Sequence, residues 1–395
     1  MKNSSFFTTL PLHNQLILAT TQSTIDTSKV MEYLQETAST NSWNNCLQIA
    51  HIHAVLPHFF KAAKPHFDLI SKEHQTFLTK LNKEIALENI KLSAELINIV
   101  KTLNDQNLPY ISIKGPALSQ EIYQDITIRQ ICDLDMLVDE TDLLLVADIL
   151  SNLGYESTLP LSLLKNQGFI SLDNDFTFLH PDKKIMVELH WKLFPTRHKM
   201  PLNFKTLYQD VKYITIKNQA ITTLSIEHNL LYLTLHASKH VFEQLKWVCD
   251  IDRLIRNSPD LNFNTLYDEA KTIEVQEPFL LGLLMSHELY ETPLPSALMK
   301  KATPTTKKLL KQALHYFQTD FTALLEPEKK RIRFLFLQTL HQEQHNRYLA
   351  LLTSAFKPSS VDYIYYQLPS KLNFLYPLLR PPRLLYKYVI KKILS

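Results

Sequence analysis

The sequence predicts an α+β protein in which a small mixed β-sheet lies between two helical regions. Glycine is scarce, with 4 residues in 395, which suits a helix-rich chain because glycine destabilises helices. Apolar residues recur at helical spacing before about residue 108 and again after about residue 226. Between these parts, short apolar runs alternate with turn residues, as is typical of strands.

These changes of pattern divide the chain into three regions. Residues 1–108 are predicted to form an N-terminal helical region, residues 109–225 an α/β core and residues 226–395 a C-terminal helical domain. The longest apolar helical stripe runs over residues 66–104 and ends before Pro109, which cannot continue a helix. No flexible glycine- or serine-rich linker separates the regions, so we expect them to pack against one another.

The core is expected to contain six strands and two helices. The strands are predicted at residues 110–113, 133–138, 176–179, 185–190, 213–216 and 221–224, and the helices at residues 117–123 and 142–153. Gly154 is predicted to end the second helix, because glycine adopts the left-handed backbone conformation readily. Beyond the core, helices are predicted at residues 227–242 and 245–255.

Composition and charge narrow the function classes. The 42 basic and 39 acidic residues give a net charge of +3, which disfavours nucleic acid as a partner but leaves it open. Four glycines are too few for a Rossmann or P-loop motif. Cys46, Cys132 and Cys249 form no disulfide or zinc pattern. With no predicted signal peptide or membrane span, we expect a cytoplasmic protein.

Two carboxylates stand out within a strand-like run. Asp133 and Asp135 are separated by one residue, so in a strand both side chains project from the same face. Adjacent carboxylates repel each other unless a cation or a proton lies between them. Oxygen ligands of this kind bind Mg²⁺, which usually also contacts substrate phosphates. The pair predicts a metal-dependent phosphoryl- or nucleotidyl-transfer site, against the alternative of a solvent-facing edge strand.

Glu188 is the best candidate for a third acidic ligand. Two metal ions between reacting oxygens need several carboxylate oxygens. Alternation along residues 185–191 places Glu188 and His190 on one face of a predicted strand and two apolar residues on the other. A solvated face is the ordinary position of a lone strand glutamate, but a second acidic strand nearby favours the metal-ligand interpretation.

Several segments of the chain occur together, in order, in one known family. They are Ile113-Lys114-Gly115-Pro116-Ala117-Leu118, Tyr123, Arg129, residues 133–138, Leu153-Gly154-Tyr155, Glu188-Leu189-His190-Trp191, and residues 235–240, 245–251 and 378–385. In these segments the chain resembles the uncharacterised bacterial nucleotidyltransferase family of the polymerase-beta-like nucleotidyltransferase superfamily. The resemblance covers most of the chain from about residue 45.

The resemblance implies a nucleotidyltransferase core in which Asp133, Asp135 and Glu188 hold two Mg²⁺ ions beside a nucleoside triphosphate such as ATP. A hydroxyl or phosphate of an unidentified acceptor would attack the α-phosphorus and release pyrophosphate, with Glu188 completing the metal site or acting as base. The Gly115-Pro116 turn departs from the superfamily, which commonly has Gly-Ser or Gly-Gly there. Proline offers a phosphate neither a hydroxyl nor a backbone N–H. The alternative is therefore a catalytically inactive nucleotide-binding or interaction protein.

The candidates for contact with the triphosphate are Lys114, Gly115, Ser119, Arg129 and Lys239. Lys114 and Gly115 follow the first predicted strand, where a lysine can act as a point charge toward phosphate. Ser119 is an alternative source of the hydroxyl that the turn lacks. Arg129 can clamp phosphate oxygens or pair with a carboxylate of the site.

Lys239 shares a predicted helix face with His236 and His240. Zinc binding by the two histidines lacks an obvious third ligand, and hydrogen-bonded histidines within a helix contact are the plainer explanation. The resemblance favours a face that lines the nucleotide cleft.

Residues 380–394 form a basic amphipathic segment near the end of the sequence. Such a segment can lie on an anionic membrane surface. The preferred alternative is a terminal helix that packs its apolar side on the helical domain.

Overall fold

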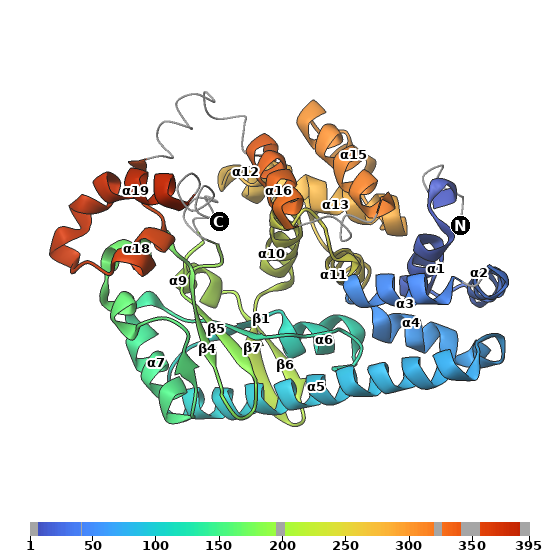
Figure 1. The fold of residues 1–395 in the computed structure, drawn as a ribbon, viewed down its shortest axis with the longest axis horizontal. Helices are drawn as coiled ribbons and strands as arrows, with labels where there is room; N and C mark the ends of the chain where they lie inside the picture. The colour runs from blue at the N-terminus through green and yellow to red at the C-terminus, as the bar shows by residue number, and fades with distance from the viewer. Residues whose placement is uncertain (1–6, 41, 195–201, 320–325, 341–355, 388–395) are drawn as a thin grey trace. The chain divides into compact units, whose positions relative to one another are not determined.

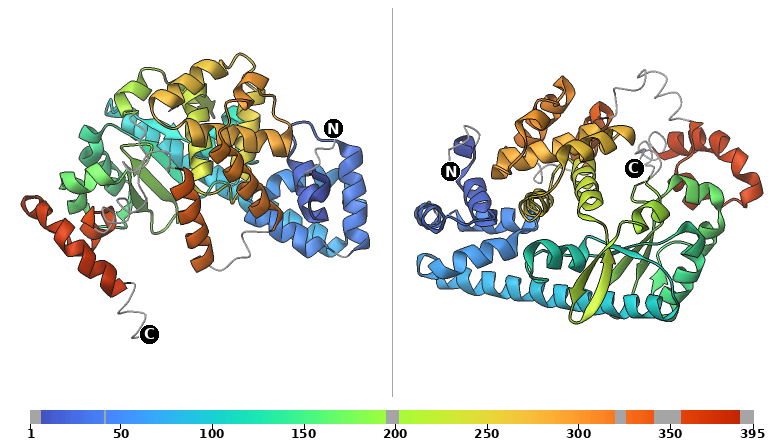
Figure 2. Two further views of the ribbon diagram at one scale, coloured as in Figure 1. Left: turned by 90° about the horizontal axis from the view of Figure 1, so that it is seen from above. Right: turned by 180° about the vertical axis from the view of Figure 1, so that it is seen from behind.

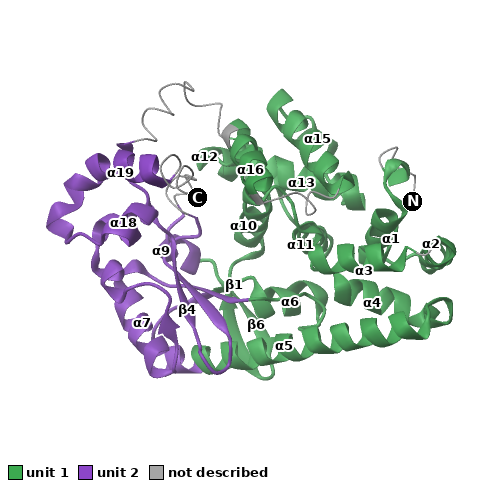
Figure 3. Ribbon diagram, viewed as in Figure 1, with its two compact units in different colours: residues 1–100, 112–132, 210–340 green, residues 101–111, 133–209, 341–395 purple. Residues whose placement is uncertain are grey.

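The computed structural model describes residues 7–40, 42–194, 202–319, 326–340 and 356–387 (Figures 1 and 2). Its elements confirm the α+β class, with helices dominant on both sides of a chain segment that contains every strand described. The chain divides into two compact units, each discontinuous in sequence (Figure 3). Unit 1 comprises residues 1–100, 112–132 and 210–340, and unit 2 comprises residues 101–111, 133–209 and 341–395. The three-region boundaries stay a prediction.

Helices make up most of unit 1. The first group is α1 (Leu12–Thr21), α2 (Thr27–Ser39), α3 (Trp43–Ile52), α4 (Leu56–Ala63) and the start of α5 (Lys72–Asp105). The second group is α10 (Ile226–Lys239), α11 (Leu245–Arg256), α12 (Phe263–Thr272), α13 (Gln276–Tyr290), α14 (Ser296–Met299), α15 (Pro304–Gln318) and α16 (Glu326–Leu340). Helices α1 to α4 pack on one another, as do α10, α11 and α13 (Figures 1 and 2).

The long N-terminal helix starts later than predicted. A 3-10 helix, η2 (Lys64–Leu69), occupies the first part of the predicted stripe. Pro65 lies in its first turn and His66 has non-helical backbone angles. The backbone departs from helical angles at His66 and again at Ile70, which is extended, so the regular helix begins only at Lys72.

Unit 1 also contains strands, which pair with one another, and the short helix α6 (Gly115–Tyr123), which follows the first of them. Strand β1 (Ile111–Ile113) leads into α6. Its Ser112 pairs in parallel with Thr223 of β7 (Gln219–Thr223), and β7 pairs antiparallel with β6 (Lys212–Ile216). The hairpin loop between β6 and β7 has positive φ at Lys217 and Asn218, which suits the right-handed twist of its strands.

Unit 2 contains four strands in the order β3-β4-β5-β2. They are β2 (Leu134–Leu137), β3 (Glu156–Ser157), β4 (Asp175–Leu179) and β5 (Met186–His190). Strands β2 and β5 are parallel, and the other two pairings are antiparallel. The two-residue strand β3 was absent from the prediction, because so short a run has no alternation to detect. Strand β2 starts at Leu134 and not at Asp133, because its pairing with β5 begins there.

The main helix of the unit 2 core is α7 (Leu143–Asn152). Gly154 follows it with φ of +90°, which confirms the glycine stop predicted for this helix. The other helices are η3 (Glu140–Asp142), η4 (Leu161–Lys165), α8 (Gln167–Leu172), α9 (Phe204–Tyr208), α18 (Ser360–Tyr366), η8 (Ser370–Leu375) and α19 (Tyr376–Leu385).

The C-terminal helices of unit 2 are held by buried polar contacts. Asp362 of α18 is fully buried, and Nε of Arg383 on α19 donates to it over 2.6 Å. Arg380 also pairs with Asp362. A Cβ at Gly168 of α8 would collide with Tyr363, so α18 packs closely on α8 at this point.

Helix α19 overlaps the basic segment only over residues 380–385, so the packing predicted for the whole segment stays a prediction. Tyr376 and Arg383 of α19 are buried, whereas Leu378 and Leu385 of the same helix, and Phe374 of η8, are more than half exposed. The charge of Asp362 accounts for this, because a buried carboxylate needs cationic partners. The part of the basic segment beyond residue 387 lies outside the described residues. No helix within the described ranges is long and apolar enough to cross a bilayer.

Candidate metal centre

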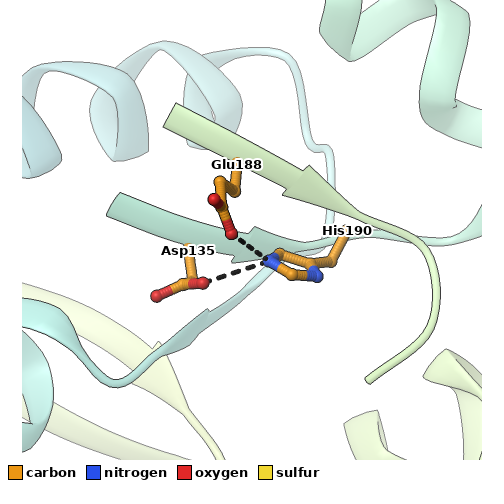
Figure 4. Close-up of side chains that lie close together, drawn as sticks. All are labelled: Asp135, Glu188 and His190. Atoms are coloured by element: carbon orange, nitrogen blue, oxygen red, sulfur yellow. Dashed lines mark hydrogen bonds and ion pairs between the residues drawn. The ribbon is translucent and has the colours of Figure 1, made fainter. Parts of the chain in front are cut away.

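Asp135 and Glu188 lie opposite each other on the unit 2 sheet (Figure 4). Strands β2 and β5 are in register, so that Asp135 pairs with Glu188 and Leu137 with His190. Because side chains alternate along strands, Asp135, Glu188 and His190 all project from one face. The intervening apolar residues are buried and anchor both strands from the other side.

His190 connects the two carboxylates. Its Nε2 lies 3.1 Å from Oδ1 of Asp135 and 3.5 Å from Oε2 of Glu188 (Figure 4). Its Nδ1 lies 3.2 Å from Nδ2 of Asn174, a buried residue directly before β4. One ligand atom from each of Asp135, Glu188 and His190 lies within 4.8 Å of the others. The three side chains can therefore bind a single metal ion.

The electrostatics of the site favour a positive charge at this point. His190 is buried, and burial by itself lowers the pKa of an imidazole. Hydrogen bonds to Asp135 and Glu188, together with the charges of Asp135 and Asp175, outweigh burial and raise the pKa of His190 to about 10. The imidazole is thus protonated at neutral pH. Surroundings that stabilise this proton also stabilise a divalent cation.

Sequence reasoning did not assign roles to His190 and Asp175. The signal for His190 was present, because strand alternation put it on the face of Glu188. Asp175 had no such signal. It lies opposite His190 only because β4 pairs antiparallel with β5, and that register cannot be read from the spacing of residues in one strand.

Asp133 lies outside the converging group. It precedes the paired part of β2 and is half-buried. The ligand atoms that meet belong to Asp135, Glu188 and His190. The role of Asp133 as a metal ligand stays a prediction.

The candidates for phosphate contact all belong to unit 1. Lys114 and Gly115 form the turn from β1 to α6, with φ of 54° and 53°. The Lys114 Nζ lies 5.6 Å from the centre of the Tyr232 ring on α10, within the range of a cation–π contact. A positive φ is costly for lysine, and such strain is found preferentially at functional sites.

We expect Lys114→Gly to be more stable than Lys114→Gln by about 1 kcal/mol, because only glycine relaxes this backbone conformation. Both variants lose the amine, so their difference isolates the strain. Chemical denaturation of the two proteins measures it. Equal stability of the two variants would contradict a strained turn.

Ser119 and Arg129 have structural partners. The Ser119 hydroxyl is buried and donates to the backbone carbonyl of Asp125 over 2.7 Å. Nε of Arg129 donates to Oδ2 of Asp250 on α11 over 2.9 Å, and the Tyr123 hydroxyl donates to Oδ1 of Asp250 over 3.0 Å. Arg129 therefore pairs with a carboxylate in unit 1, and a phosphate role for it or for Ser119 stays a prediction.

The histidines that share a helix face with Lys239 belong to an aromatic cluster. The His236 and His240 rings lie 4.8 Å apart, and each lies 5.2 Å from Trp247. Burial, followed by the charges of nearby lysines, lowers the pKa of His240 to about 3 and that of His236 well below 6.5. Neither joins a converging metal-ligand group within the described ranges, so the geometry gives no support for zinc.

The protein has an α+β fold. Two of its neighbouring parallel strands, β2 and β5, carry two carboxylates and a histidine that together could bind a cation. The model of the uncharacterised nucleotidyltransferase family matches residues 39–291, and the chain belongs to this family. The resemblance inferred from the motifs is thereby confirmed at the level of the family.

One solved structure similar to the chain is an antigenic nucleotidyltransferase-like protein from Paracoccidioides brasiliensis. The match has 17% sequence identity and a TM-score of 0.35, and it covers 53% of this chain and 97% of that one. Comparison with curated proteins finds no match.

Proposed function

We propose that the protein moves a nucleoside monophosphate from a nucleoside triphosphate to a hydroxyl or phosphate acceptor, in a reaction that depends on Mg²⁺. The observation that carries this proposal is the convergence of Asp135, Glu188 and His190 in a member of the nucleotidyltransferase family. Two carboxylates and a third ligand on adjacent strands are the type of site that such transfer needs.

The donor set fits a hard or borderline divalent cation. Mg²⁺ is commonly held by one or two carboxylates and completes its shell with water and substrate phosphates. An imidazole suits transition metals better, so a mixed set of carboxylates and imidazole also accepts Mn²⁺. Asp135 and Glu188 would hold the ion, with Asp133 as a further proposed ligand. His190 would contribute Nε2 after losing its proton.

A bound cation would neutralise charge on the triphosphate and make the acceptor oxygen more acidic. The chain's own groups would then manage the proton and the geometry. Glu188 is half-buried and Asp135 is buried, so Glu188 is the carboxylate that would accept a proton from the acceptor if it acts as base and does not complete the metal site. While Nε2 of His190 carries its proton, before a cation binds, it holds the direction of both carboxylates.

Lys114, Gly115 and Lys239 are the proposed contacts with the triphosphate. Lys114 and Lys239 would add positive charge, and the backbone N–H of Gly115 would donate at the start of α6. Pro116 supplies no N–H in that turn, which keeps open the alternative of a nucleotide-binding protein without catalysis. Nucleotide binding without release of pyrophosphate would identify that alternative.

Calorimetric titration with each of the four ribonucleoside triphosphates, with and without Mg²⁺, tests the proposal. We expect one triphosphate to bind in a Mg²⁺-dependent manner to the wild type and to lose this dependence in the Glu188→Gln variant. Glutamine keeps the size of the side chain and removes only its charge. Identical metal dependence in both proteins would contradict the proposed site.

Contact with an anionic membrane surface is a second candidate function, and the exposed face of α19 favours it. Leu378 and Leu385 of α19 lie seven residues apart, at helical spacing, and are exposed, as is Phe374 near the end of η8, while Arg383 is buried. Helices of water-soluble proteins usually have the reverse arrangement. Of the 21 large hydrophobic residues that are exposed within the described ranges, eight lie in residues 356–386, so apolar exposure is concentrated here.

The charge of this segment indicates lipid as the occupant of the exposed face. Residues 356–395 contain seven Lys or Arg and one Asp, a net charge of +6, whereas residues 1–355 contain 35 basic and 38 acidic residues, a net charge of −3. The one acid, Asp362, is already paired with two arginines. A basic and apolar surface is complementary to the headgroup region of an anionic bilayer.

The double variant Phe374→Asp/Leu378→Asp is expected to reduce co-sedimentation with vesicles of phosphatidylcholine and phosphatidylglycerol at least about tenfold. The matched control is Phe77→Asp/Leu87→Asp, which changes another exposed pair of the same residue types, on α5. Wild-type protein that fails to sediment, or that sediments equally with vesicles of phosphatidylcholine alone, would contradict lipid binding. Self-association abolished by the Phe374→Asp/Leu378→Asp variant would instead identify a second copy of the chain as the partner.

A further inference from the structure

Unit 1 contains a cavity of about 310 Å³ lined by parts of α1, α4, α6 and α11. Three basic side chains line it, namely His58 and Lys61 of α4 and Arg253 of α11. Its lining contains no aspartate or glutamate. The cavity is therefore positively charged, and its basic residues have no acidic partner in the wall.

Buried nitrogen atoms in this cavity wall lack partners. Both ring nitrogens of His58 and the Nε of Arg253 are buried and have no hydrogen-bond partner. His58 is only 5% exposed. The Nη2 of Arg253 donates to the backbone carbonyl of Gln22 over 2.6 Å, which holds the guanidinium in place. Buried polar nitrogen atoms without hydrogen-bond partners are rare in folded proteins, and a ligand is one way to satisfy them.

The groups around His58 make its surroundings positive. Arg253 on α11, Lys61 on α4 and Arg129 after α6 add positive charge near the His58 ring. The carboxylate of Asp125, also after α6, opposes them. Burial, followed by these positive charges, lowers the pKa of His58 to about 3. On its remaining side the Tyr123 ring packs edge-on, with ring centres 5.0 Å apart. His58 is thus neutral at pH 7, and a bound anion would favour its protonated form.

We propose that this cavity binds a small phosphomonoester, with its phosphate group held by Lys61, Arg253 and His58. Two permanent cations and one titratable ring match the charge of a phosphate better than that of a carboxylate. The cavity is larger than a phosphate group alone and leaves room for a small organic substituent. This site lies wholly in unit 1 and needs no metal, so it does not depend on the proposed transferase reaction.

Calorimetric titration with inorganic phosphate and with sulfate, in the absence of divalent cations, tests the site in the full chain. We expect Lys61→Gln to weaken binding of both anions at least about tenfold, because it removes a charged hydrogen bond. The matched control is Lys64→Gln, which removes the same charge one turn further along the chain but outside the cavity wall. No binding to the wild type, or equal weakening in both variants, would overturn the proposal. An unchanged result in an Asp135→Asn background separates this site from the metal centre.

His58→Phe provides a second test, which separates binding from a purely structural role. Wild-type stability should be complete above pH 6.5 and fall as the pH approaches 3, because the folded protein resists protonation of His58. At pH 5 this effect corresponds to about a thirtyfold change in the unfolding equilibrium. The Phe variant should lose this acid sensitivity while also binding sulfate at least about tenfold more weakly. A variant that binds sulfate like the wild type would overturn the proposal.

Discussion

Asp135→Asn is expected to weaken binding of the divalent cation at least about 100-fold and to reduce pyrophosphate release at least about 10³-fold. Asp135 is buried and converges with Glu188 and His190. Asparagine keeps the shape of the side chain but removes the charge that a metal ion requires. Mg²⁺-dependent triphosphate binding and pyrophosphate release measure the two losses.

The same substitution should lower the free energy of unfolding by about 2 kcal/mol, because it weakens a charged hydrogen bond to His190. That cost is too small to explain the loss of transfer through unfolding. Asp175→Asn is the matched control, since Asp175 lies opposite His190 but outside the converging group. We expect it to retain activity within about tenfold of the wild type. If both variants lost the same amount of activity, the transfer would depend only on the overall negative charge near His190 and not on Asp135 as a metal ligand.

Asp133→Asn tests the proposed further ligand separately. If Asp133 binds the metal, its replacement should also reduce cation affinity at least about 100-fold. The residue precedes the paired part of β2, so its loss should scarcely affect folding. Unchanged cation binding would remove Asp133 from the site and leave the other three residues in place.

The second large effect is expected at the buried ion pair of unit 1. Arg129 and Asp250 are almost fully buried and lie 2.9 Å apart. Arg129→Met or Asp250→Asn should each lower the free energy of unfolding by about 3 to 5 kcal/mol, because each leaves the partner charge buried alone. Replacing both residues, as Arg129→Met/Asp250→Leu, should cost less than either single change, apart from the hydrogen bond lost by Tyr123. Urea denaturation of the three variants measures these differences.

These variants also test the phosphate role predicted for Arg129. If Arg129 has only a structural role, Arg129→Met and Asp250→Asn should change triphosphate binding by the folded protein to the same extent. If Arg129→Met abolished binding while Asp250→Asn preserved it, the arginine would contact the phosphate directly. A double variant less stable than both single variants would contradict the ion-pair account.

Much of the site could be predicted from local pattern. Alternation along a strand was enough to place His190 on the face of Glu188, and a doublet of aspartates marked β2. The register that sets Asp135 opposite Glu188 could not be read from the sequence, because it depends on contacts between two strands whose paired residues are 53 positions apart in the chain. The same limit applies to Asp175, whose position follows from the antiparallel pairing of β4 with β5.

Polar contacts between residues far apart in the chain explain why the partner of Arg129 and the orientation of α19 could not be predicted from the sequence. Arg129 finds its partner 121 residues away, so its spacing from the aspartate doublet gave no guide to the partner. The orientation of α19 follows from the buried carboxylate of Asp362, which draws Arg380 and Arg383 inward. Periodicity alone predicts that a helix buries its apolar side, and here a specific charge reverses that preference.

The most direct test of the central claim is a titration of the protein with Mn²⁺, followed by electron paramagnetic resonance and repeated in the presence of Mg²⁺. Mn²⁺ accepts the same carboxylate ligands as Mg²⁺ and is detected without knowledge of the acceptor. We expect one site in the wild type that Mg²⁺ competes for, weakened at least about 100-fold in Asp135→Asn and in Glu188→Gln. Equal Mn²⁺ affinity in all three proteins would contradict a metal centre at Asp135, Glu188 and His190.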